Sequence, residues 1–393
     1  MFSFLSVFSF LIVTAYGAAT PVSVRCTAIV ADSHKLVSPL PSRHTKEFFH
    51  APARLTRDGN FFALPDGDSV LVYPTRELSS PKRLNGAALN NTFESTTGFS
   101  GNGSLVFSAV DITPNDWSLG VARFTLWERS TGRKFWQLPF NWENEDDRRI
   151  AISYDGRYFA AVGGGSVYVF DVFGKPEPIA EFDHSRLFRK ATAVFFAEDN
   201  RRIFVSPEAI YQKAEGLILK FEDQSLTFAG SIPALDAPTH EDTPNIFDGK
   251  LLGIEDLLKL TRAIHGGRRR IADAHFFGGN RYLAILSDTN AKGAHRNNLM
   301  LFDLSNRTSK NIVYGAATRF ENMFVEPQGR FAVLGGTNSI VVDLSNGETV
   351  YELQGGEHNF ATLGVDVPQR IVTGSFLDGK VREWKIPQWP GVN

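Results

Sequence analysis

The amino-acid sequence predicts an all-β protein folded as a seven-bladed β-propeller. Three observations support this fold: a β-rich unit that occurs seven times, turn residues at the same place in each unit, and a last unit that is one strand short. The composition agrees, because the 393 residues include 33 Phe and 34 Gly but only 3 Met. Aromatic residues favour pleated, half-buried strands, and glycine favours the tight turns that join them.

Each unit begins with a short apolar run, and a turn containing Gly, Asp, Asn or Gln connects it to a second run that often starts with Arg. A third run follows and often ends in Asp, and most units add a fourth. A repeat of this length is the sequence signature of propellers and related repeat folds. The first runs of the seven units are predicted at residues 51–56, 95–100, 150–154, 193–197, 272–277, 322–326 and 361–366.

The last unit ends after its third run, because the chain stops at Asn393 soon after Trp384. An alternating run at residues 22–30 precedes the first unit, and we expect it to add the missing fourth strand. This pairing would join the first and last blades and remove the open edges of the ring.

Three segments resemble blades of the WD40/YVTN-type β-propeller superfamily. Residues 370–386, RIVTGSFLDGKVREWKI, resemble the second and third strands of a WD40 blade. Residues 166–172, SVYVFDV, and 298–304, NLMLFDL, resemble third strands that end in the Trp-Asp position, with Phe replacing Trp. The Gly-His pair and the buried Asp of regular WD40 repeats are missing from most units. The resemblance therefore implies a divergent propeller over residues 20–393.

The N-terminus has the pattern of a secretory signal peptide. An apolar stretch at residues 2–13 is followed by small residues, which predicts a signal peptide at residues 1–19 and a secreted protein without a stable membrane span. An uncleaved anchor and a buried first strand are the alternatives. Sequons at Asn90, Asn102 and Asn306 predict N-glycosylation. Cys26 is the only cysteine, which excludes an intrachain disulfide, and a net charge of −2 argues against nucleic-acid binding.

One connection is nearly twice as long as the others. It forms an insertion at residues 233–270, in which residues 251–267 have the apolar spacing of a helix and Arg268, Arg269 and Arg270 are expected in a solvated loop. The insertion enters a first strand, so we place it on the upper face, over the mouth of the central channel. Long loops predicted at residues 111–120 and 288–297 belong to the same face, which favours a functional site there.

Polar residues stand where the first runs begin and are expected around this mouth. They are His50, Glu94, Arg149, Lys190, Glu321 and His358. Asp273 and His275 alternate on one strand, so both can reach one ligand or form an orienting pair for acid–base catalysis. Strand ends beside a solvent channel are polar in any propeller, which is the structural alternative. No metal site and no cofactor is predicted. The run Gly163-Gly164-Gly165 precedes another β-like run rather than a helix, so it does not indicate a dinucleotide-binding loop.

Two classes of function remain open. The chain length, the secretory N-terminus and the degenerate repeat are similar to those of the propeller proteins of fungal trichothecene toxin clusters. That resemblance implies sesquiterpenoid toxin biosynthesis, with a non-redox cyclase, isomerase or lactonase-like activity on a small molecule at the channel mouth. The alternative is a non-catalytic module that binds a protein or glycan across the upper face.

Overall fold

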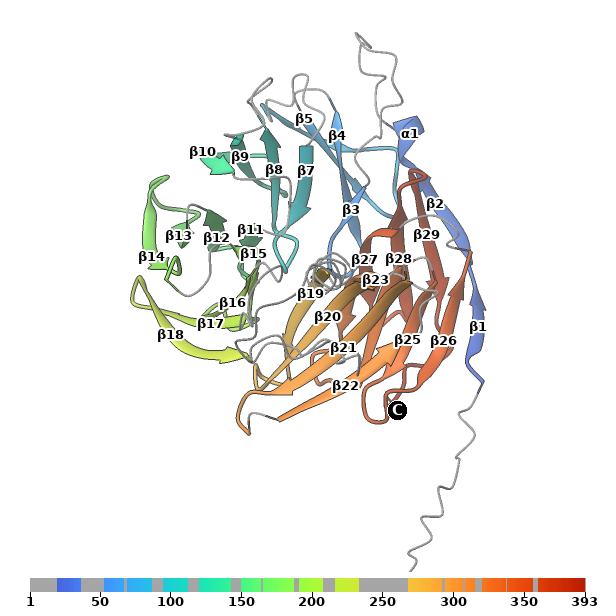
Figure 1. Ribbon diagram of the computed structural model, residues 1–393. Helices are drawn as coiled ribbons and strands as arrows, with labels where there is room; N and C mark the ends of the chain where they lie inside the picture. The colour runs from blue at the N-terminus through green and yellow to red at the C-terminus, as the bar shows by residue number, and fades with distance from the viewer. Residues whose placement is uncertain are drawn as a thin grey trace, which may run out of the picture.

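The described strands form seven sheets arranged in a ring around a central channel (Figure 1). The computed structural model describes residues 20–36, 53–66, 69–86, 95–111, 120–142, 150–163, 165–186, 191–207, 216–232, 268–291, 294–306, 308–314, 320–336, 338–355 and 360–392. Each sheet is a blade whose strands run in sequence order from the axis outwards. The predicted all-β, seven-bladed propeller is confirmed.

Blades 1 to 4 take their strands from the first part of the chain. Blade 1 contains β3 (Arg54–Leu55), β4 (Phe61–Asp66), β5 (Ser69–Pro74) and β6 (Lys82–Asn85). Blade 2 contains β7 (Ser95–Phe99), β8 (Leu105–Asp111), β9 (Gly120–Glu128) and β10 (Lys134–Trp142). Blade 3 contains β11 (Ile150–Ile152), β12 (Tyr158–Gly163), β13 (Ser166–Asp171) and β14 (Pro178–Asp183). Blade 4 contains β15 (Ala191–Phe196), β16 (Arg202–Pro207), β17 (Gly216–Glu222) and β18 (Ser225–Ile232).

Blades 5 to 7 complete the ring with the C-terminal part of the chain. Blade 5 contains β19 (Arg268–Phe277), β20 (Tyr282–Ala291), β21 (Ala294–Asp303) and β22 (Thr308–Tyr314). Blade 6 contains β23 (Phe320–Val325), β24 (Phe331–Gly336), β25 (Ser339–Asp343) and β26 (Thr349–Gln354). Blade 7 contains β27 (Phe360–Asp366), β28 (Ile371–Phe376) and β29 (Lys380–Lys385).

The core lies between the blades. A blade is a sheet with a neighbour on each face, so its second strand is largely buried on both sides and mainly apolar. In β24 the side chains of Phe331, Ala332, Val333 and Leu334 are all fully buried. The hydrophobic clusters accordingly combine residues of adjacent blades, such as blades 3 and 4, 5 and 6, and 6 and 7. A blade therefore has no complete core of its own.

The N-terminal segment closes the ring at two places. β2 (Ala28–Asp32) pairs antiparallel with β29 and supplies the missing outer strand of blade 7, as predicted. β1 (Val22–Arg25) was not foreseen as a separate strand: it pairs parallel with β26 and gives blade 6 a fifth strand. The chain crosses between the two blades at Cys26 and Thr27, whose N–H groups donate to the carbonyl oxygens of Gln354 and Glu383 at 3.1 and 2.8 Å. Figure 1 shows both blue strands against the red C-terminal blades.

Two tryptophans on third strands connect neighbouring blades. The indole N–H of Trp384 in blade 7 donates to the carbonyl oxygen of Gln354, at the end of blade 6, at 2.8 Å. Trp127 in blade 2 makes the same bond, at 3.2 Å, to the carbonyl oxygen of Asn85 at the end of blade 1. Both side chains are fully buried. The repeated position thus combines a large apolar contact with a hydrogen bond to the end of the fourth strand of the previous blade.

The structure corrects two expectations about blade 5. The predicted loop at residues 288–297 is the end of a long hairpin, because Asp288 pairs with Asn297 and the ladder continues to Ala291 and Ala294. Arg268, Arg269 and Arg270 are not in a loop but begin β19, where they pair with Asn290, Thr289 and Asp288. The backbone groups of these polar residues pair with one another across neighbouring strands, so the hairpin continues beyond its apolar part.

Other expectations fall partly or wholly outside the described residues. These are the signal peptide at residues 1–19, the insertion at residues 233–267 with its predicted helix, and the loop at residues 112–119. The helix that the structure does describe is α1 (Ser33–Leu36), a single turn after β2 that was not predicted. No helix in the described part of the chain combines the length and apolar character needed to cross a bilayer.

A partly buried carboxylate lies where blade 7 meets blade 1. Burial raises the pKa of Glu383 above its ordinary value, and the nearby charge of Asp366 acts in the same direction. Arg76 of blade 1 lowers the pKa, but its guanidinium is 3.9 Å from each carboxylate. The ionised form of Glu383 is therefore less favourable in the folded protein than in the unfolded chain.

We expect removal of residues 1–32, which contain both closing strands, to lower the melting temperature by roughly 5 to 10 °C and to broaden the transition, because blades 6 and 7 lose their outer strands. Circular dichroism melting of residues 33–393 against residues 20–393 provides the measurement, with the second chain as the control. Equal melting temperatures would show that the closing strands contribute nothing to stability.

The Glu383→Gln variant should be more stable than the parent at neutral pH. A carboxyl with a raised folded-state pKa costs no stability below its ordinary pKa, and destabilises the fold as the pH rises through the raised value. The melting temperature should therefore increase by roughly 1 to 3 °C at pH 7, and the difference should vanish near pH 4. Glu352→Gln, on the exposed side of β26, is the matched control.

Candidate functional site

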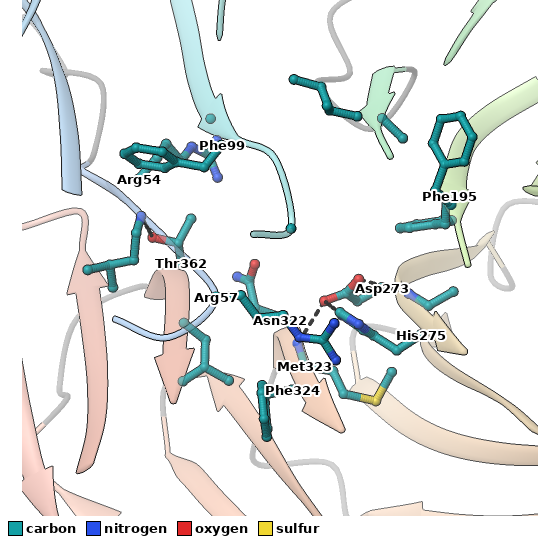
Figure 2. Close-up of a pocket in the computed structure, with 18 of the residues that line it drawn as sticks. Arg54, Arg57, Phe99, Phe195, Asp273, His275, Asn322, Met323, Phe324 and Thr362 are labelled. Atoms are coloured by element: carbon teal, nitrogen blue, oxygen red, sulfur yellow. Dashed lines mark hydrogen bonds and ion pairs between the residues drawn. The ribbon is translucent and has the colours of Figure 1, made fainter. Parts of the chain in front are cut away.

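The central channel contains a cavity of about 660 Å³ to which all seven first strands contribute. Its lining includes one or more residues of each: Leu55, Phe99, Ile152, Phe195, His275, Met323 and Leu363. Figure 2 shows the side chains of Phe99 and Phe195 on opposite sides of this space and those of Asp273, His275 and Asn322 between them. The site is therefore a property of the closed ring and not of any single blade.

The two halves of the cavity wall differ in chemistry. The first strands of blades 2 to 4 line it with apolar residues, among them Phe99, Ile150, Val194 and Phe195, and with one hydroxyl residue, Thr97. The first strands of blades 5, 6, 7 and 1 bring hydrogen-bonding residues between their apolar ones: Asp273, His275, Glu321, Asn322, Thr362 and Arg54. A molecule in this cavity would meet an apolar surface on one side and polar groups on the other.

Asp273 and His275 lie together on β19, as their spacing predicts. The Nε2 atom of His275 is 3.4 Å from Oδ2 of Asp273, and about a quarter of the histidine side chain is exposed. Both oxygens of Asp273 already accept backbone hydrogen bonds, Oδ2 from the N–H of Met323 and Oδ1 from the N–H of Ala274, each at 2.8 Å. The carboxylate thus has a structural role that requires no substrate.

Asp273 is one of three equivalent residues in successive blades. In each first strand the pairing register skips one residue, and the next residue bonds to the following blade. Asp273 of blade 5 accepts from Met323 N–H of blade 6, and the amide of Asn322 in blade 6 donates to the carbonyl oxygen of Ala361 in blade 7 at 2.9 Å. Thr362 of blade 7 accepts from Leu55 N–H of blade 1 at 3.1 Å.

We call these three side chains the inter-blade latches. In blade 4 the same register skip precedes Ala193, which has no hydrogen-bonding side chain. The latches therefore run from blade 5 through blades 6 and 7 to blade 1. This is the half of the ring in which the chain closes on itself.

Arg57 forms the floor of the cavity. It lies in the turn after β3, at the lower face, and its Nη1 atom is 2.7 Å from Oε1 of Glu198 in the corresponding turn of blade 4. The guanidinium also stacks 5.7 Å from the ring of Tyr154 in blade 3 and 5.4 Å from that of Phe324 in blade 6. One side chain thus connects four blades across the lower end of the channel.

The structure places only part of the predicted mouth. Glu321 lines the cavity beside Asp273 and His275, whereas the other predicted mouth residues lie outside the described residues: His50, Glu94, Arg149, Lys190 and His358. Asn102 and Asn306 are in exposed turns, and Asn90 is not described. Glycosylation stays a prediction. Within the described ranges, no three His, Cys, Asp or Glu side chains are grouped so that they could hold a metal ion.

Sequence reasoning missed the floor and the latches. Arg57 and Glu198 occupy the same turn position of two units, where the other turns of blades 2 and 3 have Gly101 and Tyr154. Charges of opposite sign at equivalent positions were a usable signal. The latches gave no such signal, because Asp273, Asn322 and Thr362 share neither residue type nor charge.

Comparison with solved structures agrees with the ring. The β-propeller domain of Cps50 (Swd1) from Myceliophteria thermophila matches 88% of this chain and 100% of its own length, with a TM-score of 0.53 and 14% sequence identity. The fold is that of a WD40-type propeller. At this identity the likeness concerns the fold alone, and it transfers no activity or partner to the chain.

No protein-family profile matches the sequence. No curated protein matches it either. The resemblance to the propeller proteins of trichothecene toxin clusters therefore finds no support in these comparisons, while the resemblance to WD40-type propellers agrees with the structure of the ring.

The Asp273→Ala variant tests whether Asp273 stabilises the fold as an inter-blade latch. It leaves the N–H of buried Met323 without an acceptor, so the free energy of unfolding should fall by about 1 to 3 kcal/mol in urea denaturation. His275→Ala, which leaves all three latches intact, should cost clearly less. Equal stability of the two variants would refute the latch at this position.

Proposed function

We propose that the protein is a non-catalytic binding module that holds an amphipathic segment of a partner protein in its central cavity. The proposal rests on the division of the cavity wall into an apolar half and a hydrogen-bonding half. An extended or turn-forming peptide that presents apolar side chains on one side and polar groups on the other would fit both halves. WD40-type rings commonly bind protein partners, which favours the same class of function.

The role of Asp273 supports binding over catalysis. A general acid or base must exchange protons with a substrate, and a carboxylate that accepts two backbone hydrogen bonds has little freedom to do so. Asn322 and Thr362, which cannot act as acids or bases in ordinary chemistry, do the same structural task in the next two blades. The latch series therefore explains Asp273 without a reaction.

A small-molecule function is the second candidate, and two observations favour it. The cavity volume of about 660 Å³ lies within the range of ligand pockets, and His275 lies 3.4 Å from Asp273. A non-redox cyclase or isomerase in sesquiterpenoid toxin biosynthesis would be one member of this class. It needs an apolar pocket, which blades 2 to 4 supply, and an acid–base pair.

Ala151→Trp tests the cavity directly, because Ala151 lines it on the apolar side and an indole there would occupy the space. Ser130→Trp, on an exposed turn of blade 2, is the matched control. Peptides selected on the parent protein from a random display library should combine apolar and polar residues. They should lose at least tenfold in affinity for Ala151→Trp and keep their affinity for Ser130→Trp.

The opposite outcomes identify the alternative. If no peptide is selected, or if peptides bind Ala151→Trp as tightly as the parent, the cavity is not the partner site and the proposal fails. Binding of the fluorescent amphiphile anilinonaphthalene sulfonate that Ala151→Trp abolishes, without any selected peptide, would support the small-molecule candidate instead.

A further inference from the structure

The outer edge of blade 4 differs from every other outer edge of the ring. The outermost strand of a blade has one side without a strand partner, and proteins protect such edges with charged residues, proline or a covering segment. β18, with the sequence SLTFAGSI, has neither charge nor proline along its eight residues. The other outermost strands that the structure describes each have at least one charged residue: Arg25 in β1, Asp32 in β2, Lys82 in β6, Lys134 in β10, Glu181 in β14 and Lys310 in β22.

β18 is also exposed. It pairs with β17 on one side, and no strand of the described part of the chain pairs with its other side. Phe228 is 54% exposed, and its neighbours Thr227 and Ala229 are exposed as well. An uncharged, accessible edge with an exposed aromatic ring is a template for the pairing of another strand.

The ring itself shows that an outer strand can accept a further strand. β1 adds to β26 through four residue pairs, from Val22 with Tyr351 to Arg25 with Gln354. β26 has a register skip at Val350, next to the paired residues, and the skip does not prevent the addition. β18 has a similar skip at Ala229, which leaves the four residues Ser225 to Phe228 in regular register. The available edge is thus as long as the one that β1 uses.

We infer that the edge of β18 pairs with the same edge of a second copy of this chain. A twofold axis perpendicular to the sheet sets a residue opposite its own copy, so antiparallel pairing centred on Thr227 places Thr227 opposite Thr227 and Leu226 opposite Phe228 of the second copy. Apolar side chains then meet on one face and hydroxyl side chains on the other. No like charges oppose each other within the paired residues, and a net charge of −2 gives weak repulsion between the two molecules.

Three pairs bury a small area, so the dimer is a weak one whose population rises with concentration. Sedimentation velocity of the full chain from low to high micromolar concentration measures this directly. We expect the parent to shift from monomer to dimer. A parent that stays monomeric over the whole range overturns the inference.

Charge variants at Thr227, on the twofold axis, test whether identical edges meet. Thr227→Lys and Thr227→Glu each set like charges directly opposite each other and should weaken self-association by about tenfold. An equimolar mixture of the two should restore the dimer, because opposite charges then face each other. Ile29→Lys, at an exposed apolar residue on the outer strand of blade 7, is the matched control and should dimerise like the parent.

Melting temperatures of all variants establish that each is folded. If Thr227→Lys dimerises as the parent does, or if the mixture stays monomeric, the dimer uses another surface and the inference is wrong. These readouts do not involve the central cavity, so their failure leaves the proposed binding function untouched.

Discussion

A ring of radial sheets is stable only when every blade has a neighbour on both faces. The second strands of this protein are mainly apolar and largely buried between adjacent blades, so a terminal blade without a neighbour would expose half of its core to water. Closure of the circle is therefore the condition on which the rest depends. The protein meets it by sending one N-terminal segment across two blades, with β1 on β26 and β2 on β29.

The inter-blade latches lie where closure takes place. The latches of Asp273, Asn322 and Thr362 connect blades 5, 6, 7 and 1 in turn, and Trp384 ties blade 7 to blade 6. On this half of the ring, side chains that line the channel also hold the blades together. The half that blades 2 to 4 form relies on apolar packing, such as the stacked rings of Phe124 and Phe159 at 4.2 Å. The two chemically different walls of the cavity follow from this division.

The repeat in the sequence was sufficient to predict the blades, because each unit repeats the same local pattern of runs and turns. It also predicted that residues 22–30 would complete the last blade, since a strand was missing there. Contacts across the axis could not be predicted in the same way. The pair of Arg57 and Glu198 depends on the size of the ring and on which turns face each other, and neither property is local. The register skips that orient Asp273 and its equivalents likewise arise from strand pairing rather than from a residue pattern.

The guanidinium of Arg57 also links blades that are not neighbours in the ring. Its contacts join blade 1 to blade 4 through Glu198, to blade 3 through Tyr154 and to blade 6 through Phe324. A change in the spacing of these blades would act on all three contacts together, so this one side chain senses the diameter of the whole ring.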